Sequence, residues 1–122
     1  MRYNLKGTHV AITDEIRTYL DKKLSPHDKF LSSVEASRAD IELQFDAMRD
    51  GPKYRVEITL HDAAHPNTFR TEAWGTTLHE AIDIVAGELF HALSRAKKKR
   101  QSRVRRGAAK FKSFLQGFGG WE

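Results

Sequence analysis

Hydrophobic and polar residues alternate along several stretches of the chain, and this period of two predicts β-strands. Four segments show it: residues 2–7, 34–46, 54–61 and, more weakly, 68–74. In the first of them Tyr3 and Leu5 share one face and polar side chains the other. The turn sequences Asp50-Gly51-Pro52 and His65-Pro66-Asn67 join the last three segments. Short connections of this kind indicate an antiparallel meander with one solvated face.

Two other segments repeat their apolar residues every three or four positions, which predicts amphipathic α-helices. The first covers about residues 14–25, with Thr13 as the N-cap. It is expected to end at Ser25-Pro26, because a residue before proline is pushed out of the helical conformation. The second begins at Thr77-Leu78-His79-Glu80, which has the spacing of a capping box. Its apolar stripe consists of Leu78, Ile82, Val85, Leu89, Leu93 and Ala96.

The resulting order β-α-β-β-β-α predicts an α+β fold, a two-layer sandwich. We expect a four-stranded mixed sheet with both helices packed on one face, and a parallel, right-handed connection between the first two strands. The second helix meets no breaker before Gly107, so a span of residues 77–106 would be ~45 Å long, longer than the sheet. We therefore divide the 122 residues into a domain over residues 1–106, with an extended basic final helix, and an aromatic and glycine-rich tail over residues 107–122.

Charge is distributed unevenly within the net +5 of the chain. Residues 1–94 carry 11 Lys and Arg against 15 Asp and Glu, a net charge of −4, whereas residues 95–122 carry 10 against one, a net charge of +9. Eight of twelve consecutive residues near the start of the second range are basic: Arg95, Lys97, Lys98, Lys99, Arg100, Arg103, Arg105 and Arg106. This exceeds what a helix dipole attracts to a helix end, so we expect these cations to bind phosphates.

Four further cations lie in or just after the first helix: Arg17, Lys22, Lys23 and Lys29. They extend the basic surface if the two helices lie side by side. Ordinary exposed cations would give the same pattern, so their role is left open.

The sequence gives little support to catalysis, and we expect no enzyme, no metal and no cofactor. The absence of cysteine removes thiolate nucleophiles and cysteine-ligated zinc. Asp40, Glu42 and Asp46 share a strand face, which is ordinary for the solvated side of a sheet. His61 and His65 stand four residues apart, but no helix holds them on one face, so surface histidines are favoured over metal ligands.

The tail repeats large apolar residues at helical spacing, namely Phe111, Phe114, Leu115 and Phe118. This spacing suits docking on a second copy or on a protein partner, and the alternative left open is that the tail folds back onto its own domain or frays. No apolar run reaches the ~18 residues that a membrane span needs, and residues 1–7 do not read as a secretory signal. A cytoplasmic protein without a membrane partner is therefore expected.

Several segments share one resemblance when they are taken in order: Gly7-Thr8-His9-Val10-Ala11-Ile12-Thr13 after the opening strand, the helix end Tyr19-Leu20-Asp21-Lys22-Lys23-Leu24, the meander, and Ala81-Ile82-Asp83 followed by Leu89, Leu93 and the basic end. Over about residues 2–100 the chain resembles the ribosome hibernation-promoting factor / ribosome-associated inhibitor A family, also called sigma-54 modulation proteins, in its short single-domain form. The resemblance implies a bacterial, non-catalytic translation inhibitor of stress and stationary phase. Such a protein binds phosphates of ribosomal RNA on the small ribosomal subunit and blocks the channel of mRNA and tRNAs.

The last helix departs from the family pattern at two places. The family usually opens this helix with Asp-Met-Tyr, where this chain has Thr77-Leu78-His79. It commonly continues Lys-Leu-Glu-Arg-Gln-Leu, where this chain has Glu88-Leu89-Phe90-His91-Ala92-Leu93. Two cations of the family's binding face are therefore missing, and we hypothesise that the cations of Arg95–Arg106 compensate. We place no family counterpart for residues 107–122.

Two other classes of function stay open. One is a general RNA- or DNA-binding module, since the same order of elements also resembles the double-stranded RNA-binding fold, which reads shape and phosphates. The other is a protein-interaction module whose basic helix binds an acidic partner. Preference for the small ribosomal subunit over free duplex RNA would distinguish the family's function from the first class. Loss of a protein complex, with nucleic-acid binding unchanged, would identify the second.

Overall fold

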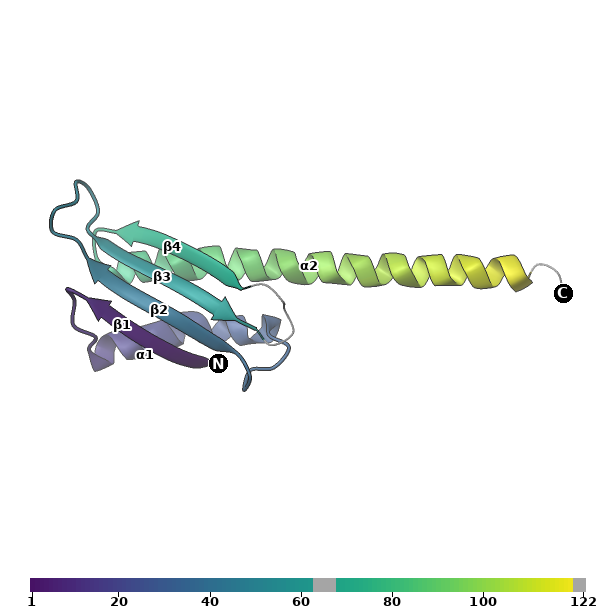
Figure 1. Ribbon diagram of the computed structural model, residues 1–122, viewed down its shortest axis with the longest axis horizontal. Helices are drawn as coiled ribbons and strands as arrows, with labels where there is room; N and C mark the ends of the chain where they lie inside the picture. Colours follow the sequence, from purple (N-terminus) through teal and green to yellow (C-terminus); the bar gives the residue numbers. More distant parts are fainter. Residues whose placement is uncertain (63–67, 120–122) are drawn as a thin grey trace.

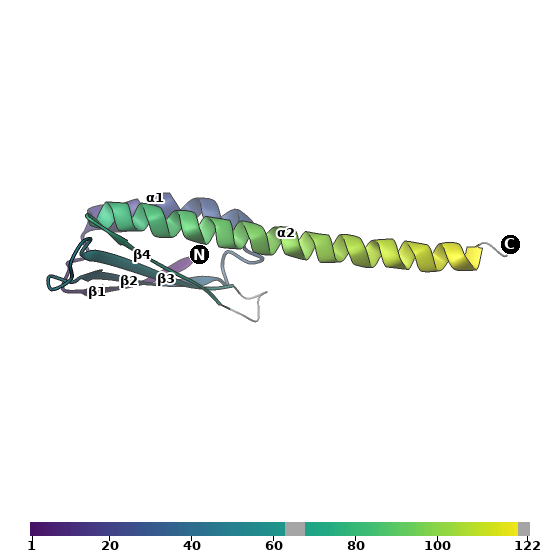
Figure 2. The same ribbon diagram turned by 90° about the horizontal axis from the view of Figure 1, so that it is seen from above.

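The computed structural model, which describes residues 1–62 and 68–119, has two layers (Figure 1). One layer is a four-stranded sheet, and the other holds two helices on the same face of that sheet (Figure 2). The elements in chain order are β1 (Arg2–Thr8), α1 (Asp14–Leu24), the 3₁₀-helix η1 (Ser25–Phe30), β2 (Arg38–Phe45), β3 (Tyr54–His61), β4 (Phe69–Gly75) and α2 (Leu78–Gly119). The predicted α+β sandwich is confirmed.

The sheet has the strand order β1-β2-β3-β4. β1 and β2 are parallel, whereas β2 and β3, and β3 and β4, are antiparallel, so the sheet is mixed as expected. Alternate residues of β2 and β3 are fully buried: Ala39, Ile41, Leu43, Val56, Ile58 and Leu60. α2 packs on β3 and β4 through its own buried stripe, of which Ile82, Val85 and Leu89 have no exposed surface. The predicted turn at residues 65–67 lies outside the described residues.

Threonine hydroxyls begin both α-helices, as the sequence predicts. Thr13 Oγ1 accepts a hydrogen bond from the backbone N–H of Ile16 at 3.2 Å, and Thr77 Oγ1 accepts one from Glu80 at 3.1 Å. The carboxylate of Glu80 accepts a hydrogen bond from the hydroxyl of Thr76 at 2.7 Å. Both threonines before α2 therefore fix its start, directly after the last residue of β4.

The chain does not leave helical geometry at Pro26, which is a difference from the prediction. α1 ends at Leu24, but the next six residues form η1. Proline suits the first turn of a helix because its fixed φ is helical and its missing N–H would have no partner there. η1 carries His27 and Phe30 into buried positions in the helical layer.

α2 is longer than the predicted helix over residues 77–106. It has 42 residues, which corresponds to ~63 Å. Gly107 does not adopt the left-handed conformation that ends many helices, and Ala108, Ala109 and Lys110 after it favour helix. A glycine in a helix costs only about 1 kcal/mol in such a context. The expected helix end at residue 106 is therefore wrong, while a functional division between residues 1–106 and 107–122 stays a prediction.

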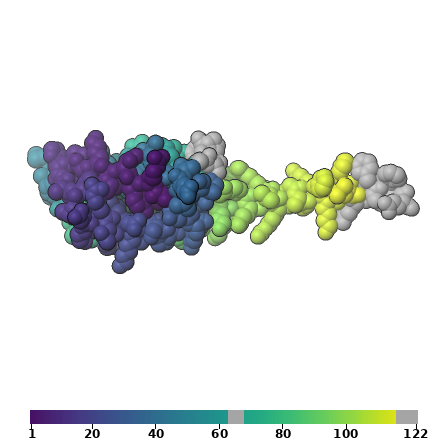
Figure 3. Space-filling model, turned by 90° about the horizontal axis from the view of Figure 1, so that it is seen from below, coloured from purple at the N-terminus to yellow at the C-terminus, as the bar shows by residue number. Residues whose placement is uncertain are grey.

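Only the first half of α2 packs on the rest of the molecule. Leu93 is the last residue of its described part to be buried, and residues 98–115 are exposed on all sides. Figure 3 shows this stretch as a narrow rod that projects from the body. We call residues 98–115 the free part of α2.

The junction between β4 and α2 gives a test of the packing. A Cβ on Gly75 would lie 2.6 Å from the backbone nitrogen of Ala81 and 2.9 Å from the carbonyl oxygen of Thr77. We predict that Gly75→Ala lowers the free energy of unfolding by about 1–3 kcal/mol, because backbone atoms must shift to admit the methyl group. Urea denaturation measures the change, and an unchanged or raised free energy would contradict this description of the junction.

Gly87→Ala is the matched control, since a Cβ on Gly87 meets no atom within 4 Å. The higher helix propensity of alanine is expected to raise the free energy of unfolding by about 1 kcal/mol. The two substitutions add the same methyl group, one at the end of β4 and one within α2, and should change stability in opposite directions.

Candidate nucleic-acid interface

α1 and α2 lie side by side and run in the same direction (Figure 2). Near the start of both helices, His79 Nε2 donates a hydrogen bond to a carboxylate oxygen of Glu15 at 2.7 Å. Further along, His27 Nε2 donates to the backbone carbonyl oxygen of Ala86 at 2.8 Å. The two helices therefore lie side by side as considered, with α1 beside residues 79–83 of α2, before the basic segment begins.

The three cations of α1 differ in what surrounds them. Arg17 and Lys22 are exposed. Lys23 Nζ lies 3.2 Å from Asp83 Oδ1, which also accepts a hydrogen bond from the hydroxyl of Tyr19 at 2.5 Å. Burial acts to raise the pKa of Asp83, but the hydrogen bonds from Tyr19 and Lys23 outweigh it and lower that pKa below its ordinary value. Asp83 stays ionised at neutral pH and offsets the charge of Lys23.

Among the four cations in or just after the first helix, Lys29 shares an aromatic contact with a cation of the basic segment. Its Nζ lies 5.2 Å from the ring centre of Phe30 and 4.9 Å from that of Phe90. Lys97 Nζ, from α2, lies 5.8 Å from the same Phe30 ring. Ammonium groups are attracted to the faces of aromatic rings. The two phenylalanines, whose centroids are 4.9 Å apart, thus gather cations of η1 and α2 around one aromatic pair.

The basic segment, Arg95–Arg106, begins where the packing of α2 ends. Lys97 is half-buried and the other seven cations are exposed: Arg95, Lys98, Lys99, Arg100, Arg103, Arg105 and Arg106. None of the eight forms an ion pair with a carboxylate of the described residues. Lys110 and Lys112, which the sequence analysis left outside the site, are exposed on the same helix. The helix-forming residues Ala108, Ala109 and Lys110 after Gly107 were the sequence signal that could have added these two lysines to the site.

This arrangement suits a large anion rather than a small ligand. Successive helical residues turn by about 100°, so the cations point to several sides of a rod. Arginine can bind a phosphate with two parallel hydrogen bonds, and lysine adds a compact charge. Lys99 lies four residues from both Arg95 and Arg103, and each such like-charge pair destabilises a helix by about 0.2–0.5 kcal/mol. A polyanion bound along the rod would remove that repulsion.

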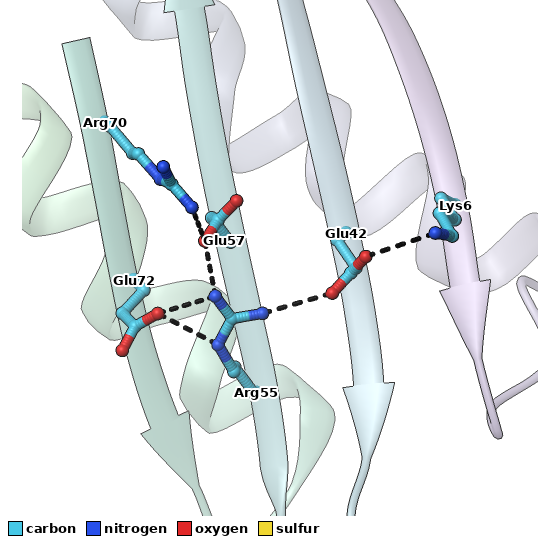
Figure 4. A network of polar contacts seen from close by, with 6 residues as sticks. All are labelled: Lys6, Glu42, Arg55, Glu57, Arg70 and Glu72. Carbon is cyan, nitrogen blue, oxygen red and sulfur yellow. Dashed lines mark hydrogen bonds and ion pairs between the residues drawn. The ribbon is translucent and has the colours of Figure 1, made fainter.

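The solvated face of the sheet has the opposite character, because its charges are paired with one another (Figure 4). Six side chains on four strands form the network: Lys6, Glu42, Arg55, Glu57, Arg70 and Glu72. Arg55, whose side chain is only 14% exposed, lies among the three glutamates, 3.2 Å from Glu42 and 2.6 Å from Glu72. This face therefore presents little unpaired charge to a polyanion.

The carboxylates considered for acid–base work belong to such contacts. Glu42 lies in the network, and Asp46 accepts a hydrogen bond from a backbone N–H of the following turn. The hydrogen bond from Asn4 is the main cause that lowers the pKa of Asp40, and His61 adds to it against the opposing effect of burial. A general acid at neutral pH needs a raised pKa, so this environment does not suit Asp40 for that role.

The histidines of the described residues form no metal site. Within residues 1–62 and 68–119, no group of three or more His, Asp or Glu side chains is placed to hold a metal ion. His61 Nε2 lies 3.1 Å from Asp40, and His65 falls outside the described residues. None of the helices in these ranges is both long enough and apolar enough to cross a membrane.

Known proteins resemble the chain over most of its length. The family model described as sigma 54 modulation protein / S30EA ribosomal protein matches residues 3–101. A ribosome hibernation promotion factor of Lactococcus lactis subsp. cremoris is 29% identical over 97 residues, which cover 80% of this chain and 50% of that protein. One of Staphylococcus aureus is 25% identical over 118 residues, which cover 95% of this chain and 60% of that protein. The second similarity therefore reaches into residues 107–122, for which the sequence analysis placed no counterpart.

The chain spans about half the length of these curated relatives. In the matches with solved structures, this chain covers nearly the whole length of the other chain. The Thermus thermophilus Protein Y N-terminal domain has a TM-score of 0.66 and 28% identity, covering 78% of this chain and 98% of that one. A ribosomal subunit interface protein from Coxiella burnetii has a TM-score of 0.64 at 18% identity, covering 80% and 99%, and shows the shared fold.

The paired charges on the sheet predict how stability depends on pH. Arg70 and Arg55 lower the pKa of Glu57 below its ordinary value, the hydrogen bond from Arg70 being the largest cause. A lowered pKa in the folded state stabilises the protein above the unfolded-state value of about 4.3, and this contribution is lost as the pH falls through the folded-state pKa. We therefore predict that Glu57→Gln loses less stability than the wild type between pH 6 and pH 3, measured by urea denaturation.

Glu88→Gln is the control for this measurement. Glu88 is exposed on α2 and forms no ion pair with the described residues. The stability of Glu88→Gln should depend on pH in the same way as the stability of the wild type. An equal effect of both substitutions would mean that the network does not contribute to acid sensitivity.

Proposed function

The chain belongs to the sigma 54 modulation protein / S30EA ribosomal protein family, and from this premise we propose that it is a ribosome hibernation factor. It binds the small ribosomal subunit through cations of its helical layer and blocks the channel in which mRNA and tRNAs pass. The inhibition is occlusion, in which no bond is made or broken and no cofactor takes part. A factor with this target acts in the cytoplasm, where ribosomes are.

The observation that carries the proposal is the unpaired charge of Arg95–Arg106. Eight cations lie on one helix, and none pairs with a carboxylate of the described residues. Cations without protein partners keep mobile counterions, and transferring phosphates into their place releases those ions into solution. Ribosomal RNA supplies such phosphates at high density. The net charge of −4 on residues 1–94 keeps the rest of the molecule from competing for them.

Lys29 and Lys97 connect the body of the protein to this surface. Their ammonium groups lie 5.2 Å and 5.8 Å from the centre of the Phe30 ring, so positive charge from η1 and from α2 gathers around one side chain. The packed part of α2 has Glu88 and His91 at the two positions where the family usually has cations. We propose that Lys29, Lys97 and the cations after them take over those contacts. Arg17 and Lys22 add exposed charge on α1, and Lys23 adds less because Asp83 offsets it.

Residues 1–106 form the ribosome-binding part in this proposal, and residues 107–119 continue its last helix as an extension. The extension is available to a protein partner or a second copy while the basic segment is bound. The two parts can therefore be tested separately by substitutions on either side of Gly107.

Co-sedimentation with purified ribosomes and separated subunits tests the proposal. We predict that the wild type pellets with the small subunit and that Lys97/Lys98/Lys99/Arg100→Ala loses at least 10-fold in affinity, because four phosphate contacts are removed. Circular dichroism should show a folded body, since three of these side chains are exposed and none is in the core.

A charge-matched variant separates position from total charge. Arg2/Lys6/Arg38/Arg70→Ala removes four cations from the solvated face of the sheet and should pellet nearly as the wild type does. Equal losses of affinity in both variants would mean that the interaction depends on net charge and not on the position of the cations. Equal affinity for the small subunit and for free duplex RNA would favour a general RNA-binding module.

The salt dependence gives a second, independent prediction. If five to eight cations contact phosphates, the slope of log K against log salt concentration should be about −4 to −7. Affinity for the small subunit measured at several salt concentrations provides this slope. A slope near −1 would contradict binding through the basic segment.

A further inference from the structure

The free part of α2 carries a second feature that phosphate binding leaves unused. Val104, Ala108, Phe111 and Leu115 follow one another at spacings of four, three and four residues, so they form one narrow stripe along the helix. The side chains of Val104, Phe111 and Leu115 are 67%, 63% and 52% exposed. Phosphates offer no surface that would cover them. The spacing is that of a helix that packs against one other helix.

The charged residues that border this stripe are all basic. Arg105 and Lys112 directly follow Val104 and Phe111 and line one side, while the other side carries Arg100, Gly107 and Phe114. Residues 98–115 contain no Asp or Glu. In a pair of packed helices the bordering positions face the partner, and their charges decide which partner is accepted.

A second copy of the chain is a poor partner for this stripe. In a pair of identical helices, parallel or antiparallel, the bordering cations of one copy would face cations of the other. Repulsion between such positions is a means by which helices reject wrong partners. A partner helix with Asp or Glu at its bordering positions would instead form ion pairs while covering the stripe.

We propose that the free part of α2 binds an acidic amphipathic helix of another protein. The partner presents a stripe of aliphatic side chains bordered by carboxylates. The interaction goes beyond the proposed function, because Phe111 and Leu115 carry it and no ribosomal contact is needed for it.

The test uses the full chain and three synthetic peptides of three heptads each. The first has Leu at the two core positions of every heptad and Glu at the bordering positions. The second replaces Leu by Ser, and the third replaces the bordering Glu by Lys. In fluorescence anisotropy at physiological salt, we expect the first peptide to bind at least 10-fold more tightly than either of the others.

Three double variants locate the contact. Phe111→Ser/Leu115→Ser should weaken binding of the first peptide at least 10-fold, and these exposed side chains lie outside the core of the body. Arg105→Gln/Lys112→Gln should weaken it more than Lys99→Gln/Arg106→Gln, which removes the same charge from the opposite side of the helix. Equal binding by Phe111→Ser/Leu115→Ser and the wild type would overturn the proposal.

Other occupants of the stripe have distinct signatures. Dimerisation of the protein alone, abolished by Phe111→Ser/Leu115→Ser in sedimentation equilibrium, would overturn the proposal in favour of a second copy. Tighter binding to phosphatidylglycerol vesicles than to the first peptide would overturn it in favour of a lipid surface. We expect Phe111→Ser/Leu115→Ser to co-sediment with ribosomes as the wild type does. Loss of that co-sedimentation with unchanged peptide binding would assign the stripe to the ribosome and overturn the proposal. If the first peptide fails to bind while the wild type still co-sediments with ribosomes, this proposal is overturned and the proposed function stands.

Discussion

The length of the sheet limits how much of α2 can be buried, and the rest of the structure depends on this limit. A strand of eight residues spans ~26 Å, whereas the 42 residues of α2 span ~63 Å. The helix can therefore bury its apolar stripe only as far as Leu93, and the residues after Lys97 have no surface to pack on. Cations are tolerated there because they stay hydrated, which a position over the sheet would not allow.

The two ends of the helical layer differ in chemistry. Over the first turns of α2, Glu15 of α1 contacts His79, and Asp83 of α2 contacts Lys23 in the last turn of α1, so these charges are offset locally. At the other end, Lys29 of η1 and Lys97 of α2 both lie near the Phe30 ring, and neither forms an ion pair with a carboxylate of the described residues. One helical layer thus changes from paired to unpaired charge along its length.

The elements that depend on local pattern were predictable, and those that depend on three-dimensional fit were not. Alternation identified the strands, and Thr13 and Thr77 identified the helix starts, because both signals arise from neighbouring residues. η1 was missed since Pro26 disfavours helix for the residue before it but suits a new helical turn itself. The end of α2 was misplaced because a glycine weighs against a helix by only about 1 kcal/mol and its neighbours decide the outcome.

For the candidate site, the sequence identified the basic segment by its density of charge alone. It could not distinguish Lys23 from Lys29, since one faces Asp83 and the other a phenylalanine ring only after the helices have packed. Nor could it show that the sheet carboxylates neutralise Arg55 and its neighbours, because those contacts join four strands. Contacts between distant segments decided both points.

The separation of a net charge of −4 on residues 1–94 from +9 on residues 95–122 has a consequence for kinetics. It gives the molecule a large electric dipole along its longest dimension. In the field of a polyanion such a molecule rotates during diffusion and arrives with its projecting helix first. Added salt then lowers the association rate constant, because screening removes the torque that orients the molecule before contact. The lifetime of the bound state is set by the contacts themselves.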